Sequence, residues 1–100
     1  MTDYVLVYIG GDMPDDMTEE QRNAVMGEWG AWYEKLGAAI KDGGKPFGAS
    51  KHVGDGTAPH ATGYTVITAD SLEAAVAAVD GHPHLKYGGQ VSVYETFDIM

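Results

Sequence analysis

The chain has 100 residues, of which 15 are Asp or Glu and six are Lys or Arg, so its formal net charge is −9. This length predicts one domain, residues 1–100, and a hydrophobic fraction of 44% is typical of a globular protein. Nucleic acid and anionic membranes are excluded as expected partners, because both require clustered Lys and Arg and the six here are scattered. The absence of cysteine excludes disulfides, thiol nucleophiles and Cys-based metal sites.

The first residues of the chain do not resemble a targeting signal. Asp3 stands where a signal peptide carries Lys or Arg, and the apolar run at 4–9 is far shorter than the roughly 20 residues that span a bilayer. We therefore expect a soluble, cytoplasmic protein.

The first half of the sequence predicts a strand, a long helix and a weaker strand. Residues 4–9 are branched and aromatic, as in strands. Thr18 and Gln21 form a capping-box pattern at a helix start. The helix then keeps an apolar stripe, formed by Val25, Trp29, Trp32, Leu36 and Ile40. Residues 43–54 predict an edge strand, because Pro46 cannot donate to a ladder.

The second half predicts another strand and another helix before a final strand. Residues 61–68 are the better strand, and Asp70 or Ser71 can cap the helix that follows. One face of that helix is apolar, formed by Leu72, Ala75, Val76 and Val79. Gly81 suits a left-handed helix end, and Pro83 is expected to stop the helix.

With the last strand at 90–97, the order is β-α-β-β-α-β, which predicts a ferredoxin-like α+β fold with an antiparallel sheet. Both helices then cover one face of the sheet. Alternation in the first strand separates Val5, Val7 and Ile9 from Tyr4, Leu6 and Tyr8. We assign the aliphatic set to the helices and the tyrosine-rich set to the open face. Two such faces packed together predict a homodimer with a cleft lined by Tyr4, Tyr8, Tyr64 and Tyr94.

Four segments carry a family likeness: YVLVYIGGDMP, EWGAWYEKLGAAIKDGGKPFG, GYTVITADSLEAAVAAVDGHPHL and GGQVSVYETF. Together they resemble the YCII-related (YciI-like) family of small bacterial proteins over nearly the whole chain. The resemblance implies a ferredoxin-like fold and a dimeric α+β barrel. It also implies a cleft with a proposed His–Asp acid/base dyad. Neither dyad position matches, because the first helix has no histidine and His82 precedes Pro83.

The histidines are the natural proton carriers near neutral pH. We take His82, His84 and His60 as candidate catalytic residues, and Asp55 or Asp80 as possible partners of an imidazole. A simpler interpretation is available, since His82 and His84 follow a helix end whose partial negative charge favours an imidazolium.

A metal site is the alternative use of the histidines. Zinc needs three or four ligands, and the pair His82 and His84 supplies two. His52, His60 or Asp55 could complete a set, but no spacing requires it, so we predict no metal and no cofactor.

Three hypotheses follow. The first is a dimeric domain that binds a small apolar or aromatic molecule among the tyrosines. The second is a small enzyme in which His82 or His84 transfers a proton on a small organic substrate. The third is a structural interaction module with a filled interface and no pocket.

Overall fold

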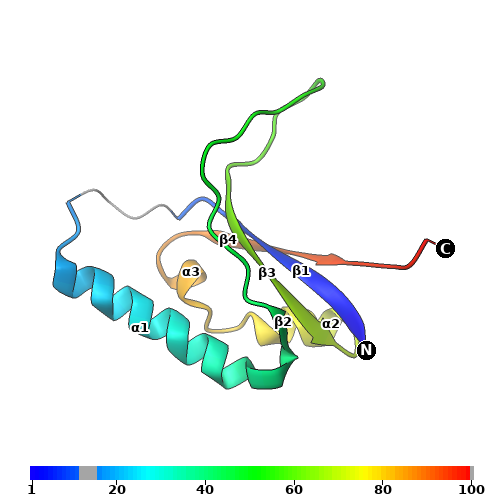
Figure 1. Ribbon diagram of the computed structural model, residues 1–100, viewed down its shortest axis with the longest axis horizontal. Helices are drawn as coiled ribbons and strands as arrows, with labels where there is room; N and C mark the ends of the chain where they lie inside the picture. Colours follow the sequence, from blue (N-terminus) through cyan, green and yellow to red (C-terminus); the bar gives the residue numbers. More distant parts are fainter. Residues whose placement is uncertain (12–15, 100) are drawn as a thin grey trace.

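The computed structural model describes residues 1–11 and 16–99. Its elements, shown in Figure 1, are β1 (Thr2–Ile9), α1 (Glu19–Leu36), the 3-10 turn η1 (Gly37–Ala39), β2 (Ile40–Asp42), β3 (Ala61–Ala69), α2 (Leu72–Ala78), α3 (Pro83–Lys86) and β4 (Gln90–Glu95). This is the predicted β-α-β-β-α-β order with one added short helix, α3.

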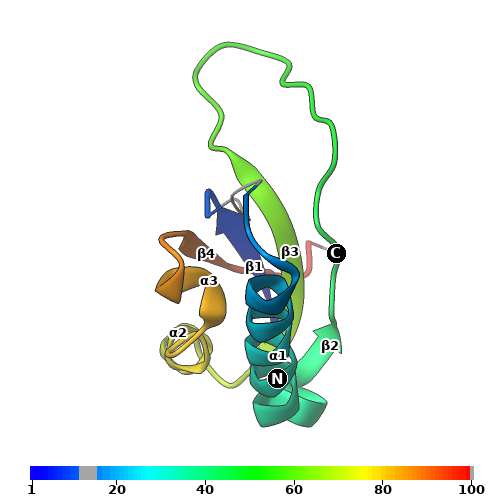
Figure 2. The same cartoon turned by 90° about the vertical axis from the view of Figure 1, so that its left-hand side faces the viewer.

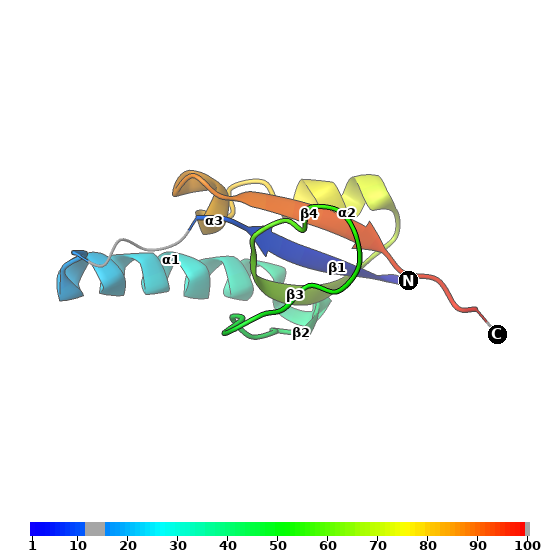
Figure 3. The ribbon, with the colours of Figure 1, turned by 90° about the horizontal axis from the view of Figure 1, so that it is seen from above.

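The four strands form one antiparallel sheet in the order β2-β3-β1-β4. This order is that of a ferredoxin-like fold, so the predicted α+β class is confirmed. Seen from above, α1 runs on the side of β2 and β3, and α2 and α3 run on the side of β4 (Figure 3). In the described parts of the chain, no helix has the length and apolar character needed to cross a membrane.

The helix starts follow from local capping. Thr18 caps α1 through its side chain, which accepts from the backbone N–H of Gln21, and Gln21 accepts from the backbone N–H of Thr18. Ser71 caps α2 in the same way by accepting from the N–H of Ala74. Gly81 has φ +78°, the left-handed conformation predicted for it.

The predicted strand at 43–54 is wrong in position. The edge strand lies earlier, at Ile40–Asp42, and within 43–54 only Pro46 pairs with β3, in a single bridge to Gly63. Gly44, with a φ of +76°, interrupts the extended strand between Asp42 and the bridge at Pro46. Residues 43–60, here called the arm, then extend away from the sheet and return to β3 (Figures 1 and 2).

The predicted faces of β1 are reversed. Tyr4, Leu6 and Tyr8 are at most 4% exposed and lie under the helices, while Val5, Val7 and Ile9 are half-buried on the other strand face. The buried set packs with the rest of the core, formed by Trp32, Ile67, Ala75 and Val79.

Two physical reasons account for the reversal. Tyrosine fills more of the space between sheet and helices than valine, and the hydroxyl of Tyr8 has a buried partner in Thr65, 2.6 Å away. Tyr64 and Tyr94 do lie on the open face, as predicted, because they are registered with Val7 and Val5 of β1. The apolar face predicted for the second helix is also only half correct, since Leu72 and Val76 are exposed.

Candidate active site

The segment after α2 builds the site because it turns directly into α3. Pro83 was expected after the end of the second helix, and α2 does end before it, at Ala78; Pro83 is also the first residue of α3, where its missing N–H is not needed. His82 is the N-cap, and its Nδ1 accepts the backbone N–H of His84 at 3.0 Å. The two imidazoles are therefore placed by a helix start, not by a helix end.

An ion pair fixes α3 against α1. Lys86 donates to Glu28 of α1 at 2.7 Å, which lowers the pKa of Glu28 and raises that of Lys86. Both side chains are partly exposed, so the pair orients α3 more than it stabilises the fold.

His82 is fully buried, with an exposed fraction of 0%. Its ring lies among three aromatic rings, with centroids 4.3 Å from Trp32, 4.6 Å from Trp29 and 5.0 Å from Tyr8. Burial, and then the nearby His84, lower the pKa of His82 to about 4. The imidazole is therefore neutral at physiological pH.

The hydrogen bonds of His82 fix its tautomer. Because Nδ1 is an acceptor, the proton sits on Nε2, which donates to the Tyr8 hydroxyl 3.2 Å away. Tyr8 then donates to Thr65 at 2.6 Å, and Thr65 donates to the carbonyl of Gly43 at 3.2 Å. This defines a one-directional chain from α3 to the base of the arm. Burial raises the pKa of Tyr8 well above its usual value, so Tyr8 remains a donor.

His84 is 7% exposed and differs from His82 in what its ring contacts. Its Nε2 lies 3.0 Å from the carbonyl of Ile9, which can only accept, so the neutral ring carries its proton on Nε2. No described residue bonds to Nδ1, which is left as an acceptor. A Cβ at Gly89 would overlap this ring, and one at Gly11 would lie 2.6 Å from its Cε1. Both glycines are therefore needed for the ring to occupy this place.

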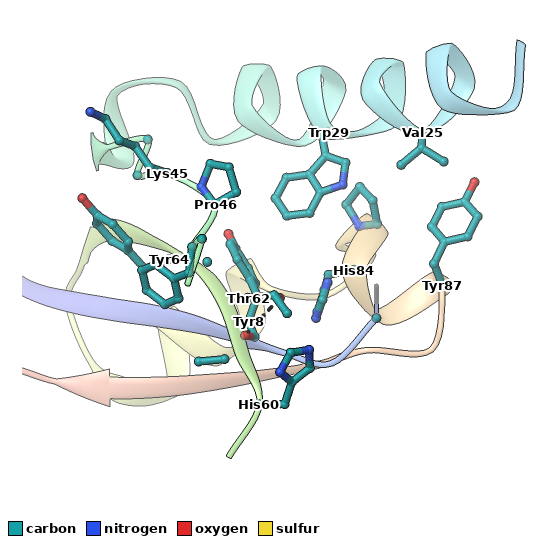
Figure 4. A pocket seen from close by; sticks show the side chains of 18 of the residues that line it. Tyr8, Val25, Trp29, Lys45, Pro46, His60, Thr62, Tyr64, His84 and Tyr87 are labelled. Atoms are coloured by element: carbon teal, nitrogen blue, oxygen red, sulfur yellow. Dashed lines mark hydrogen bonds between the residues drawn. The ribbon is translucent and has the colours of Figure 1, made fainter. Parts of the chain in front are cut away.

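A cleft of about 1260 Å³ opens in front of His84, between α1, α3, the end of β1 and the arm. Figure 4 shows the rings of Trp29, Tyr8 and His84 together at its centre. Ligand pockets usually measure roughly 300–1,000 Å³, so this cleft is larger than a small molecule needs.

The structure brings together some of the predicted site residues and separates others. His84, His60 and Tyr8 line the cleft, and Tyr64 borders it beside Phe47 of the arm, although its strand position is registered with Val7 of the open face. His60 reaches it because its carbonyl accepts from Gly10 N–H, next to the Ile9 carbonyl that His84 contacts.

The remaining predicted residues lie elsewhere. His82 stands behind Tyr8, Tyr4 is 1% exposed in the core, and Tyr94 is on the open face of the sheet. Asp55 and Asp80 are absent from the described lining, although His52 is part of it. Across residues 1–11 and 16–99, no three His, Cys, Asp or Glu side chains gather as metal ligands would.

Several residues of the site are not apparent from sequence. The sequence pattern places Trp29 in the apolar stripe of α1, but in the structure it faces the cleft next to Tyr33. Lys45 reads only as an edge-strand lysine, and Thr65 as an ordinary strand residue. The one available signal is the Gly-Gly pairs that follow β1 and precede β4, because Gly11 and Gly89 are the residues that admit the His84 ring.

Comparisons with known proteins establish the fold alone. No family model and no curated protein matches the chain. A solved structure does: 5-chloro-2-hydroxyhydroquinone dehydrochlorinase (TftG) from Burkholderia phenoliruptrix AC1100, in complex with 2,5-dihydroxybenzoquinone. The TM-score is 0.59 and the sequence identity 21%, over 96% of this chain and 93% of that one. The chain therefore shares its fold, over nearly its full length, with a protein solved with a small ring compound.

Proposed function

We propose that this protein binds a small aromatic molecule in the cleft. The observation that carries the proposal is the group of rings at the centre of the cleft, Trp29, Tyr8 and His84, here called the aromatic floor. Trp29 meets Tyr8 edge-on with centroids 5.1 Å apart, and Tyr8 lies 5.3 Å from His84. Such a floor offers a flat ring both faces and edges to pack against. The likeness to a structure that holds 2,5-dihydroxybenzoquinone supports a ligand of one ring.

Binding of 2,5-dihydroxybenzoquinone and catechol, measured by calorimetry, tests this proposal. We expect both compounds to bind. Trp29→Leu should weaken their binding by about tenfold or more, because the ring of the ligand loses its largest contact. Phe97→Leu is the matched control, since Phe97 is 81% exposed and lies outside the described lining of the cleft. No binding of either compound at millimolar concentration, or equal loss in both variants, would contradict the proposal.

A second candidate function, proton transfer by His84, is favoured by the Nδ1 of this ring, to which no described residue bonds. The Nε2 proton of His84 is held by the Ile9 carbonyl, so Nδ1 can take a proton from a ligand hydroxyl. The O–H bond breaks, an N–H bond forms, and an imidazolium then faces the resulting phenolate. Tyr8 is a poor competitor for this role, because its raised pKa keeps it protonated.

His84→Gln separates binding from proton transfer. The glutamine amide can still donate to the Ile9 carbonyl, whereas the acceptor at Nδ1 is lost. A nitrophenol serves as the probe, because its ionised form is yellow. We expect the bound nitrophenol to ionise at lower pH on the wild-type protein than in water, and this shift to disappear in His84→Gln. An identical ionisation pH on both proteins would exclude His84 as the base.

We further infer that the chain is a cytoplasmic homodimer of the YCII-related family. The segment likeness and the fold support the family. The uncovered sheet face supports the dimer, because Val5 and Val66 lie there half-buried beside Tyr94, which is 56% exposed.

A further inference from the structure

The described residues that line the cleft include basic side chains and no carboxylate. The lining has 25 described residues, and its titratable members other than tyrosine are all bases: Lys45, His52, His60 and His84. No described lining residue is Asp or Glu. The chain has 15 acidic residues in 100, so a lining of 25 residues with the average composition of the chain would contain about four Asp or Glu. The described part of the lining is thus basic, whereas the chain as a whole is strongly acidic.

The pairing of the lysines strengthens this contrast. Lys41 is paired with Asp3 and Lys86 with Glu28, so the charges of both are compensated. Lys45 forms no ion pair with any residue in the described ranges. A lysine with no carboxylate partner among the described residues, at the rim of an apolar cleft, attracts anions, and the acidic remainder of the surface repels them.

The basic groups lie at separate places along the cleft. Figure 4 shows Lys45 at one end, beside Pro46 and Tyr64, with its ammonium end directed outward at the rim, and His84 and His60 toward the other. Trp29 and Tyr8 lie between them. A single ring over Trp29 and Tyr8 can therefore direct one substituent toward His84 and another toward the lysine.

We propose that the ligand is an aromatic carboxylate with a ring hydroxyl: the hydroxyl lies at Nδ1 of His84 and the carboxylate lies toward Lys45. This inference rests on the proposed binding function and specifies the class of compound. Lys45 acts here as a residue that determines specificity, because it selects the charge of the ligand without taking part in proton transfer.

Calorimetry near pH 7.5 with three matched probes tests the inference: 4-hydroxybenzoate, its neutral amide 4-hydroxybenzamide, and 4-methoxybenzoate. We expect the hydroxybenzoate to bind about tenfold more tightly than the amide, with a preference that falls as salt is added. The methoxy compound should bind more weakly than the hydroxybenzoate, because it has no proton for His84.

Lys45→Gln should reduce the preference for the carboxylate over the amide to within about twofold. Lys35→Gln removes the same charge from α1 outside the cleft and should keep the preference. Equal affinity of wild-type protein for acid and amide would overturn the inference and leave the proposed aromatic binding intact. Failure of every single-ring probe to bind would overturn both.

Discussion

At the scale of single residues, His82 does two tasks with one neutral ring. Its Nδ1 caps α3 and its Nε2 proton holds the Tyr8 hydroxyl, so both nitrogens are used. Protonation of Nδ1 would set an N–H against the N–H of His84. The His82 ring must therefore be neutral for this cap to form, which agrees with its low pKa.

This neutrality predicts that stability falls as the solution becomes acidic. The pKa of His82 is about 4 in the folded chain and about 6.5 when unfolded, so between these values the unfolded chain binds the extra proton. The contribution is complete above pH 6.5 and declines as pH falls toward 4, by roughly 3 kcal/mol in all. Denaturant unfolding at a series of pH values measures it.

His82→Asn is the variant for comparison, because its Oδ1 can still accept the N–H of His84 but does not titrate. It should be less stable at neutral pH, since the bond to Tyr8 is lost, and its stability should vary less between pH 6.5 and 4. Parallel curves for the two proteins would mean that another group causes the decline.

The face of each β1 residue shows what sequence leaves open at this scale. Alternation divides the strand correctly into two sets, yet both sets are apolar, so period alone does not say which is buried. The residues that decide the face are distant in sequence. Gly63 lies opposite Tyr8, Thr65 accepts a hydrogen bond from the Tyr8 hydroxyl, and His82 donates one to it. A tyrosine with buried polar partners belongs inside.

At the scale of elements, the base of the arm depends on one glycine. The Gly43 carbonyl accepts from Tyr33 at 3.0 Å as well as from Thr65, which ties the arm to α1 and β3. Gly44 follows with φ +76°, and a Cβ there would overlap the carbonyl oxygen of Tyr64. The side wall of the cleft therefore begins at a backbone position that only glycine fits.

Gly44→Ala should accordingly destabilise the fold by roughly 2 kcal/mol or more, through left-handed strain and backbone overlap together. Gly48→Ala is the matched control, because no atom lies within 4 Å of its Cβ and its φ is not positive. We expect it to change stability by less than about 0.5 kcal/mol. Thermal and denaturant unfolding of the two variants measure the difference, and similar losses in both would contradict this account of the arm.

Element types follow from sequence better than element limits do. Caps at Thr18 and Ser71 are local signals, and both helices start at them. The edge strand was expected too late, because Ile40 fits the apolar stripe of α1 and the turn at Gly37 interrupts it without a strong sequence signal. Pro83 is ambiguous for the same kind of reason: proline after a glycine ends one helix and also suits the first position of the next.

At the scale of the whole molecule, the strand order follows from the sequence because a β-α-β-β-α-β chain has few ways to pair its strands. The cleft does not follow, because its walls come from α1, α3, the end of β1 and the arm, and their side chains meet only after folding. Sequence placed the cleft on the open sheet face, between two chains. The structure has one on the helix side of a single chain.

The open sheet face remains the predicted interface of a homodimer. Val66, Val5 and Tyr94 form a row across β3, β1 and β4 on this face. Apolar rows of this kind are seldom left in water. The wild-type protein should therefore sediment as a dimer at micromolar concentration.

Val66→Asp should give monomers, because the partner would have to bury an unpaired carboxylate. Val76→Asp places the same charge on α2, where Val76 is 54% exposed on the helix side, and should remain dimeric. Far-UV circular dichroism of both variants checks that the fold is kept. A monomeric wild-type protein, or a folded Val66→Asp dimer, would place the interface elsewhere; the arm would then be the next surface to examine, because Val53 at its tip is fully exposed.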